Sequence, residues 1–151
     1  MGTLFDKLLS DHGRCERHLE ALSKSVADKD WNLAAQYCAH FSESFIGHIE
    51  EEESSFFSCL RQSVKGCDWF LDDLRMDHVR LKALLTRMLQ AVHDKNAEGF
   101  YLHAESLLIL MRDHSVKEED ILYPAVQRRL QNETHEAVRK TSCAPQQREP
   151  S

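Results

Sequence analysis

The chain contains one internal repeat, and this repeat limits its possible folds more than any other feature of the sequence. Residues of the same or similar type recur after a shift of 66 positions. The shift pairs His12 with His78, His48 with His114, Glu52 with Glu118, Asp11 with Asp77, and Arg14 with Arg80. A small repeated unit cannot bury its apolar face alone, so two copies are expected to pack together.

Four long segments have the periodicity of helices with one buried face, because apolar residues recur at steps of three and four. We expect a first helix after Thr3 and a second from the N-cap Asp30 to about Leu60. A third is expected from about Asp68, and a fourth after the turn at residues 94–96. The predicted fold is all-α: an up-down-up-down four-helix bundle built from two repeated helical hairpins.

The fourth segment contains a strong helix breaker, Pro124, which predicts a break or kink because proline lacks an N–H and clashes with the preceding turn. A shorter helical piece is expected to follow to about Lys140. We assign residues 1–140 to one bundle domain and residues 141–151 to a polar, disordered tail. A chain of 151 residues can bury such a core without disulfides.

Charge and cysteine content exclude several classes of protein. The net charge of -6 and the lack of a basic cluster argue against nucleic-acid and anionic-membrane partners. The N-terminal residues do not resemble a signal peptide, and no apolar run is long enough to cross a membrane. Five cysteines without a C-x-x-C pair are typical of reduced thiols, so we expect a cytoplasmic protein.

Ligand-type side chains fall on the inward faces of all four predicted helices. They are His12, His48, Glu52, His78, His114 and Glu118. A spacing of four residues puts His48 and Glu52 on one helix face, and the repeat does the same in the second half. Buried carboxylates need a partner or a metal ion. The six residues therefore predict a metal site, and mixed imidazole and carboxylate donors suit iron or manganese, with zinc as an alternative.

The stoichiometry follows from the two carboxylates. If Glu52 and Glu118 each bridge two ions, each ion receives about four protein donors, fewer than the roughly six of an octahedral site. Positions then remain open for water, a bridging oxygen or dioxygen. We expect two metal ions, with iron (Fe2+/Fe3+) as the first candidate and with room for a bridging oxo or hydroxo group.

A metal-free polar core and a ferritin-like centre are the competing hypotheses for these residues. A single histidine in an apolar stripe is usually a hydrogen-bonded core residue, but here three positions repeat in register. A ferritin-like centre requires Glu-x-x-His, and no histidine here has a glutamate three residues before it. The five other histidines (His18, His40, His93, His103 and His135) are expected at the surface, and Cys15 is expected to fill the core near His12.

At these positions the chain resembles the hemerythrin-like family of HHE cation-binding domains. The shared pattern is His12, then His48-x-x-x-Glu52, then His78, then His114-x-x-x-Glu118, over roughly residues 4–130. The resemblance implies an up-down four-helix bundle around a non-haem di-iron centre that meets dioxygen. Members of the family carry or sense oxygen, handle iron, or respond to oxidative or nitrosative stress.

Two departures separate this chain from the oxygen-carrying members. Those proteins have a second histidine one turn along the third helix, where this chain has Leu74 and Lys82. They also take the last carboxylate five residues after its histidine, which would be Glu119 rather than the Glu118 that the repeat favours. Both departures weaken the case for a dedicated oxygen carrier.

The leading functional hypothesis is a di-iron protein that binds dioxygen or a related small oxidant, for sensing, buffering or iron handling. The alternative is a di-iron enzyme that reduces peroxide or nitric oxide or delivers iron for repair. A metal-free helical interaction module is a third hypothesis. Any protein partner is left open by the sequence.

Overall fold

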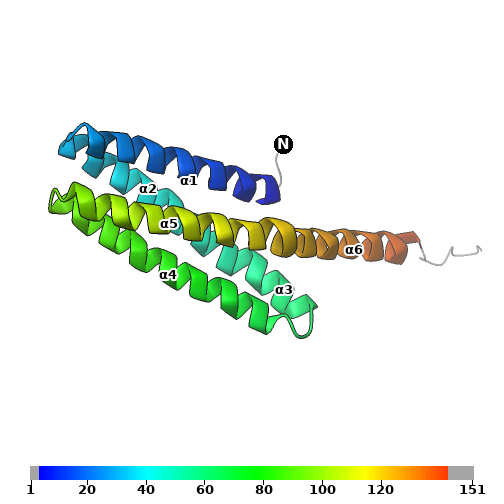
Figure 1. Ribbon diagram of the computed structural model, residues 1–151. Coiled ribbons are helices and arrows are strands. Elements are labelled where there is room, and N and C mark those ends of the chain that lie inside the picture. The colour runs from blue at the N-terminus through cyan, green and yellow to red at the C-terminus, as the bar shows by residue number, and fades with distance from the viewer. Residues whose placement is uncertain (1–3, 143–151) are drawn as a thin grey trace, which may run out of the picture.

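The computed structural model describes residues 4–142, and every regular element within this range is helical. The elements are α1 (Leu4–Ala27), α2 (Trp31–Glu51), the π-helical turn η1 (Glu52–Phe57), α3 (Ser58–Ser63), α4 (Asp68–His93), α5 (Ala97–Lys117), the π-helical turn η2 (Glu118–Leu122) and α6 (Tyr123–Ser142). Two of the rods are composite, because α2 continues through η1 into α3, and α5 through η2 into α6. Figure 1 shows the four rods alternating in direction, which confirms the predicted up-down-up-down bundle.

The repeat extends to the backbone of the two hairpin turns. Lys29 and Lys95, 66 positions apart, both have a φ of 54°, in the left-handed region. Each is followed by an N-cap whose side chain accepts a backbone N–H three residues on: Asp30 from Leu33, and Asn96 from Gly99. Equivalent turns therefore start α2 and α5, and α1–α2 and α4–α5 form two hairpins of one design.

The hairpins pack side by side, with α2 against α4 and α1 against α5. The buried apolar side chains form two separate clusters. The larger, which includes Phe41, Met88 and Leu107, fills the end near the hairpin turns. The smaller, which includes Leu8, Phe57 and Leu74, fills the other end. A layer of buried polar side chains lies between them.

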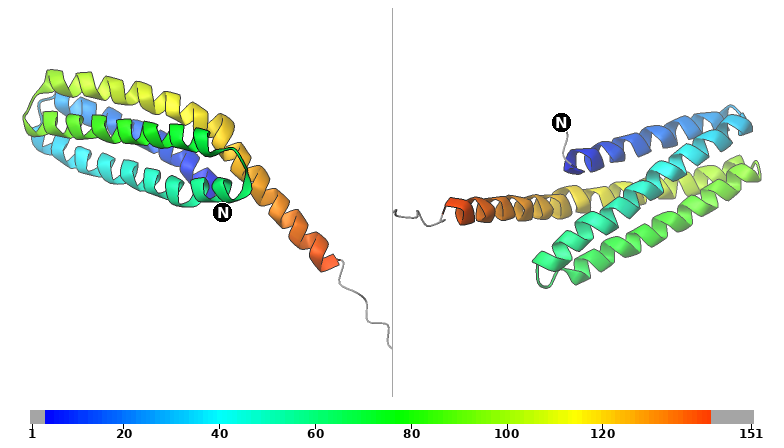
Figure 2. Two further views of the ribbon diagram at one scale, coloured as in Figure 1. Left: turned by 90° about the horizontal axis from the view of Figure 1, so that it is seen from below. Right: turned by 180° about the vertical axis from the view of Figure 1, so that it is seen from behind.

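Pro124 bends the fourth rod without ending it, so of the two predicted outcomes, a break or a kink, the kink occurs (Figure 2). It lies at the second position of α6, two residues after the end of η2. The wider π turn that precedes it accommodates the missing N–H and the bulk of the ring. Figure 2 shows the change of direction at this junction and α6 projecting beyond the bundle. The helix runs to Ser142, just past the expected end at Lys140.

Three further expectations concern membrane spans, the cysteines and the tail. Among residues 4–142, no helix is both long and apolar enough to cross a membrane. Cys15, Cys38, Cys59 and Cys67 are free thiols. Most of the segment expected to be a disordered tail, residues 143–151, lies outside the described residues.

Candidate metal centre

The polar layer contains all six predicted ligand residues, and each rod of the bundle contributes to it. His12 comes from α1, His48 from α2, His78 from α4 and His114 from α5. Glu52 and Glu118 are the first residues of the two π turns. All are buried except His12, whose side chain is 14% exposed.

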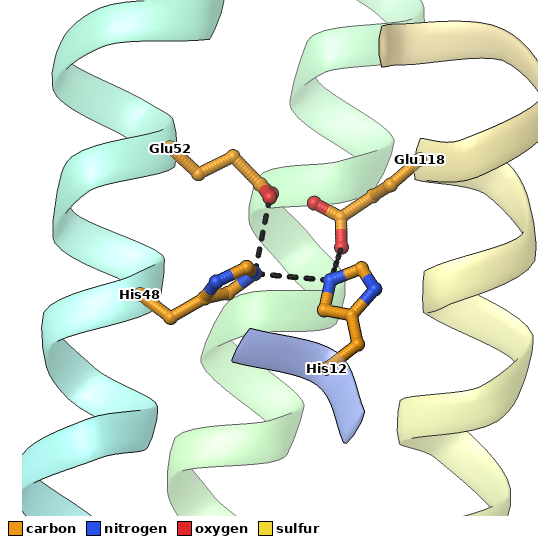
Figure 3. A group of neighbouring side chains, drawn as sticks. All are labelled: His12, His48, Glu52 and Glu118. Carbon is orange, nitrogen blue, oxygen red and sulfur yellow. Dashed lines mark hydrogen bonds and ion pairs between the residues drawn. The ribbon is translucent and has the colours of Figure 1, made fainter. Parts of the chain in front are cut away.

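These side chains form two groups that share both glutamates. One group is His12, His48, Glu52 and Glu118, and the other is His78, His114, Glu52 and Glu118. Within each group, the possible ligand atoms lie within 4.8 Å of one another. Figure 3 shows the first group converging on one point, with His48 and Glu52 from one rod, His12 from α1 and Glu118 from the rod that contains η2. Two ions held in this way would share Glu52 and Glu118 as bridges.

The carboxylate oxygens face both groups. Glu52 directs Oε2 toward His48 Nε2 at 3.4 Å and Oε1 toward His78 Nε2 at 3.1 Å. Glu118 Oε1 lies 3.3 Å from His12 Nε2 and 3.2 Å from His114 Nε2. The other oxygen of Glu118, Oε2, is buried and has no hydrogen-bond partner among residues 4–142. A buried carboxylate oxygen without a donor is costly, and a cation in the layer would satisfy it.

A second set of carboxylates fixes the orientation of the four imidazoles. The Nδ1 atoms of His48 and His114 lie 3.2 and 3.1 Å from Asp11 Oδ2 and Asp77 Oδ2, and those of His12 and His78 lie 3.0 Å from Glu119 Oε1 and Glu53 Oε1. A carboxylate at Nδ1 indicates that this nitrogen carries the proton and that Nε2 is free to bind a metal. The repeat thus includes the partners of the ligands as well as the ligands.

The free Nε2 atoms face each other in pairs. His12 Nε2 lies 3.1 Å from His48 Nε2, and His78 Nε2 lies 2.9 Å from His114 Nε2. If each Nδ1 donates to its carboxylate, both atoms of a pair present lone pairs and cannot hydrogen-bond to each other. A cation near each pair resolves this conflict, so the donor set fits two metal ions.

The electrostatics of the layer favour ionised carboxylates. Burial acts to raise the pKa of Glu52, but its contacts with the imidazoles of His114, His48 and His78 in the metal-free protein outweigh it and hold the pKa well below its usual range. For Asp77, burial also acts to raise the pKa, and hydrogen bonds from Lys117 and His114 lower it overall. The layer is therefore anionic and suited to cations.

The two faces of the polar layer have different neighbours. On the side of the hairpin turns, a cavity of about 30 Å³ is lined by the four histidines together with Cys15, Leu81 and Met111. This is room for about one or two water-sized molecules. On the opposite side, the rings of Phe57 and Tyr123 stack on His78 and His12. Burial and the neighbouring Glu52 carboxylate raise the pKa of Tyr123 far above its usual range.

Several functional contacts were not anticipated from the sequence. Glu119, the alternative last ligand, lies outside both groups and contacts His12 Nδ1 instead. The sequence shows Asp11 and Asp77 as a repeated pair but does not indicate their role. The buried hydroxyl of Tyr123, which donates to Glu52 Oε2 at 3.0 Å, had no sequence signal beyond the mismatch with Phe57.

The remaining histidines and Cys15 lie outside the ligand groups. His40, His93 and His135 are exposed, whereas His18 and His103 are half-buried, and no metal-type group of the described residues includes any of these five. Cys15 is buried in the core next to the cavity, and burial raises the pKa of its thiol to about 11. Leu74, where oxygen carriers have a histidine, is buried in the smaller apolar cluster.

Comparison with known proteins agrees with this arrangement. The family model described as the hemerythrin HHE cation-binding domain matches residues 3–126, which includes all six candidate ligands. No curated protein and no solved structure gives a significant match to the chain. Because the family model covers most of the sequence, the chain belongs to the hemerythrin family of HHE cation-binding domains.

Proposed function

We propose that this protein holds two iron ions in the polar layer and binds dioxygen or a related small oxidant there. The observation that carries the proposal is the sharing of Glu52 and Glu118 between the two ligand groups. Each position then has two imidazole nitrogens and one oxygen from each bridge. This mixed donor set suits iron, and its four donors leave positions open for a small ligand.

The chain's own residues would orient and shield such a centre. Asp11, Asp77, Glu53 and Glu119 hold the imidazoles with Nε2 facing inward. The apolar clusters on either side limit access by water. The cavity beside the histidines offers a small ligand a place next to the ions. Bound iron would supply reversible electron transfer to that ligand.

The experiment is metal analysis combined with optical spectroscopy. Protein reconstituted anaerobically with ferrous iron is expected to hold about two iron ions per chain and to gain near-ultraviolet charge-transfer bands on exposure to air. Reduction should bleach these bands. Less than one ion per chain, without such bands, would refute the proposal and favour the metal-free helical module.

The alternative is an enzyme that reduces peroxide or nitric oxide at the same centre. It is supported by the lack of an additional histidine at Leu74, which leaves more open positions than a dedicated carrier has. Catalytic turnover of peroxide or nitric oxide by the iron-loaded protein would favour this enzyme. Reversible oxygen spectra without turnover would favour the binding protein.

A further inference from the structure

Among the buried positions at which the two halves of the candidate metal centre differ, one pair differs by a single hydroxyl group. Phe57 and Tyr123 are equivalent in the repeat, and both are buried, with at most 1% of their surface exposed. The Phe57 ring stacks on His78 with centroids 5.6 Å apart, and the Tyr123 ring stacks on His12 with centroids 5.9 Å apart. The rings therefore occupy the same place in each half, and the chemical difference between them is one hydroxyl group.

This hydroxyl group lies on the side of the candidate centre formed by His12 and His48. It donates a hydrogen bond to Glu52 Oε2 at 3.0 Å and lies 3.2 Å from His12 Nε2. Glu52 Oε2 is the oxygen that faces His48, whereas Oε1 faces His78. The hydrogen bond from Tyr123 therefore falls on the Glu52 oxygen that faces His48, and not on the oxygen that faces His78.

Building on the two-metal site proposed above, we infer that Tyr123 makes the two positions unequal, so that the ion held by His12 and His48 is the weaker and more readily exchanged one. A donor on a carboxylate oxygen withdraws charge from it and reduces its attraction for a cation. The effect is strong here because the hydrogen bond is buried, where electrostatic interactions are less screened. The ion at His78 and His114 faces the oxygen of Glu52 without this bond.

A second asymmetry, at the protein surface, acts in the opposite direction and is expected to have a smaller effect. Lys117 contacts Asp77 at 2.9 Å and Asp73 at 3.0 Å, whereas the equivalent of Lys117 in the first half is Glu51. Lys117 reduces the charge on Asp77 and thereby weakens His114 as a donor. However, its side chain is 36% exposed and acts through two intervening groups, so solvent screens it. Tyr123 acts directly on a bridging oxygen in the interior.

The test measures the two positions separately, in variants that keep only one of them intact. This is necessary because repulsion between two bound cations would give two binding steps even if the two positions were identical. His48→Ala leaves intact the position formed by His78 and His114. His114→Ala leaves intact the position formed by His12 and His48. Metal-free proteins are titrated with Co2+ alone, using calorimetry and the visible absorption of bound Co2+. We expect Co2+ to bind His114→Ala about ten-fold more weakly than His48→Ala, within the range of outer-shell effects.

Two further substitutions provide matched controls. Tyr123→Phe should strengthen Co2+ binding to His114→Ala about ten-fold and leave His48→Ala unchanged. Phe57→Tyr should weaken binding to His48→Ala, because it puts a hydroxyl group beside His78. Lys117→Met in the His48→Ala background, which keeps His114, should change Co2+ binding by much less than ten-fold. Thermal melting of each metal-free variant confirms that it is folded.

The outcomes distinguish this inference from the proposed function. If wild-type protein takes up fewer than two Co2+ ions, the two-metal site fails and the inference with it. If it takes up two, but Tyr123→Phe leaves Co2+ binding to His114→Ala unchanged or weakens it, only the inference is refuted. Weaker binding would mean that the tyrosine oxygen is itself a metal ligand.

Discussion

Adjacent glutamates at the end of the second hairpin have different surroundings. The Glu118 side chain is 1% exposed and faces His12 and His114. The Glu119 side chain is 43% exposed and contacts the far nitrogen of His12. Glu52 and Glu53 repeat this division in the first hairpin, with Glu53 at His78. One residue in each pair therefore faces the candidate ions, and the next orients a ligand.

This division predicts different losses of metal. Glu118→Ala should impair binding of both ions, because the carboxylate is shared by both groups. Glu119→Ala should reduce affinity at the His12 and His48 position by about ten- to a hundred-fold. Glu53→Ala is the matched control and should act at His78 instead. Metal-to-protein ratios after desalting, with calorimetric titration, measure both effects. Full metal content in Glu118→Ala, with loss in Glu119→Ala, would reassign the last ligand to Glu119.

Asp77 predicts a pH dependence for the metal-free protein. Its pKa is lowered overall by Lys117 and His114 against the effect of burial. A carboxylate with a lowered folded-state pKa stabilises the fold above its ordinary pKa, near about 4, and loses this contribution as the pH falls through the folded-state value. Asp77→Asn should therefore lower the melting temperature most at pH 7, with the difference from wild type shrinking below about pH 4.

The matched control for this prediction is the neighbouring Asp73→Asn. Asp73 also contacts Lys117, but its side chain is 48% exposed, so a much smaller change in melting temperature is expected. A difference between Asp77→Asn and wild type that stays constant from pH 7 to pH 3 would contradict the role assigned to the Asp77 carboxylate.

At the scale of elements, the two π turns interrupt otherwise regular helices at the polar layer. Each begins at a candidate bridging glutamate. A π turn has one more residue than an α turn, and such turns are frequent at functional sites. In η1 the extra residue allows Glu52 and Glu53 both to reach histidines, and Phe56 and Phe57 both to be buried.

Deleting one exposed residue from a π turn tests this role. Removal of Ser54 should convert η1 to regular α-helix and rotate Phe56 and Phe57 relative to Glu52. We expect helical circular dichroism to remain, while metal uptake and melting temperature both fall. Removal of Asp120, the equivalent residue in η2, should do the same. Two tightly bound ions in either deletion variant would show that the π turns are dispensable.

The helices and the six candidate ligands were predictable because they depend on local periodicity and on the repeat. The apolar steps gave the helix faces, and the shift of 66 positions put His12, His48 and Glu52 in register with their partners. The π turns were not predicted, although Phe56-Phe57 and Leu122-Tyr123 contain a signal in retrospect: two adjacent apolar residues in each half. Whether such a pair widens a turn is decided by packing between helices.

The carboxylates that contact the Nδ1 atoms of the histidines were harder to predict, because a charged residue beside a ligand on a helix is usually solvated. Asp11 reaches His48 on another rod, and Glu53 reaches His78 on another. Both contacts join residues on different helices, so they depend on the relative rotation of the rods. The hydroxyl of Tyr123 reaches Glu52 across the bundle in the same way, and periodicity contains no information about such contacts.

For the whole molecule, the candidate centre connects all four rods, so metal binding and folding should be linked. A ligand at a concentration of a hundred times its dissociation constant stabilises the folded state by about 2.7 kcal/mol. Removing metal with a chelator should therefore lower the melting temperature by about 5–10 °C for a chain of this size. Differential scanning calorimetry of metal-free and reloaded protein measures this. Identical melting curves would mean that the six residues are only polar core residues.

The sharing of Glu52 and Glu118 has a consequence for the connection between the hairpins. Each candidate position takes two histidines from one half of the chain and one carboxylate from each half, so neither half completes a position alone. Residues 64–67 are the peptide connection between the halves. If this loop were cut, the two fragments should associate when metal is added and dissociate when a chelator removes it. The centre is in this sense a subunit interface enclosed within a single polypeptide.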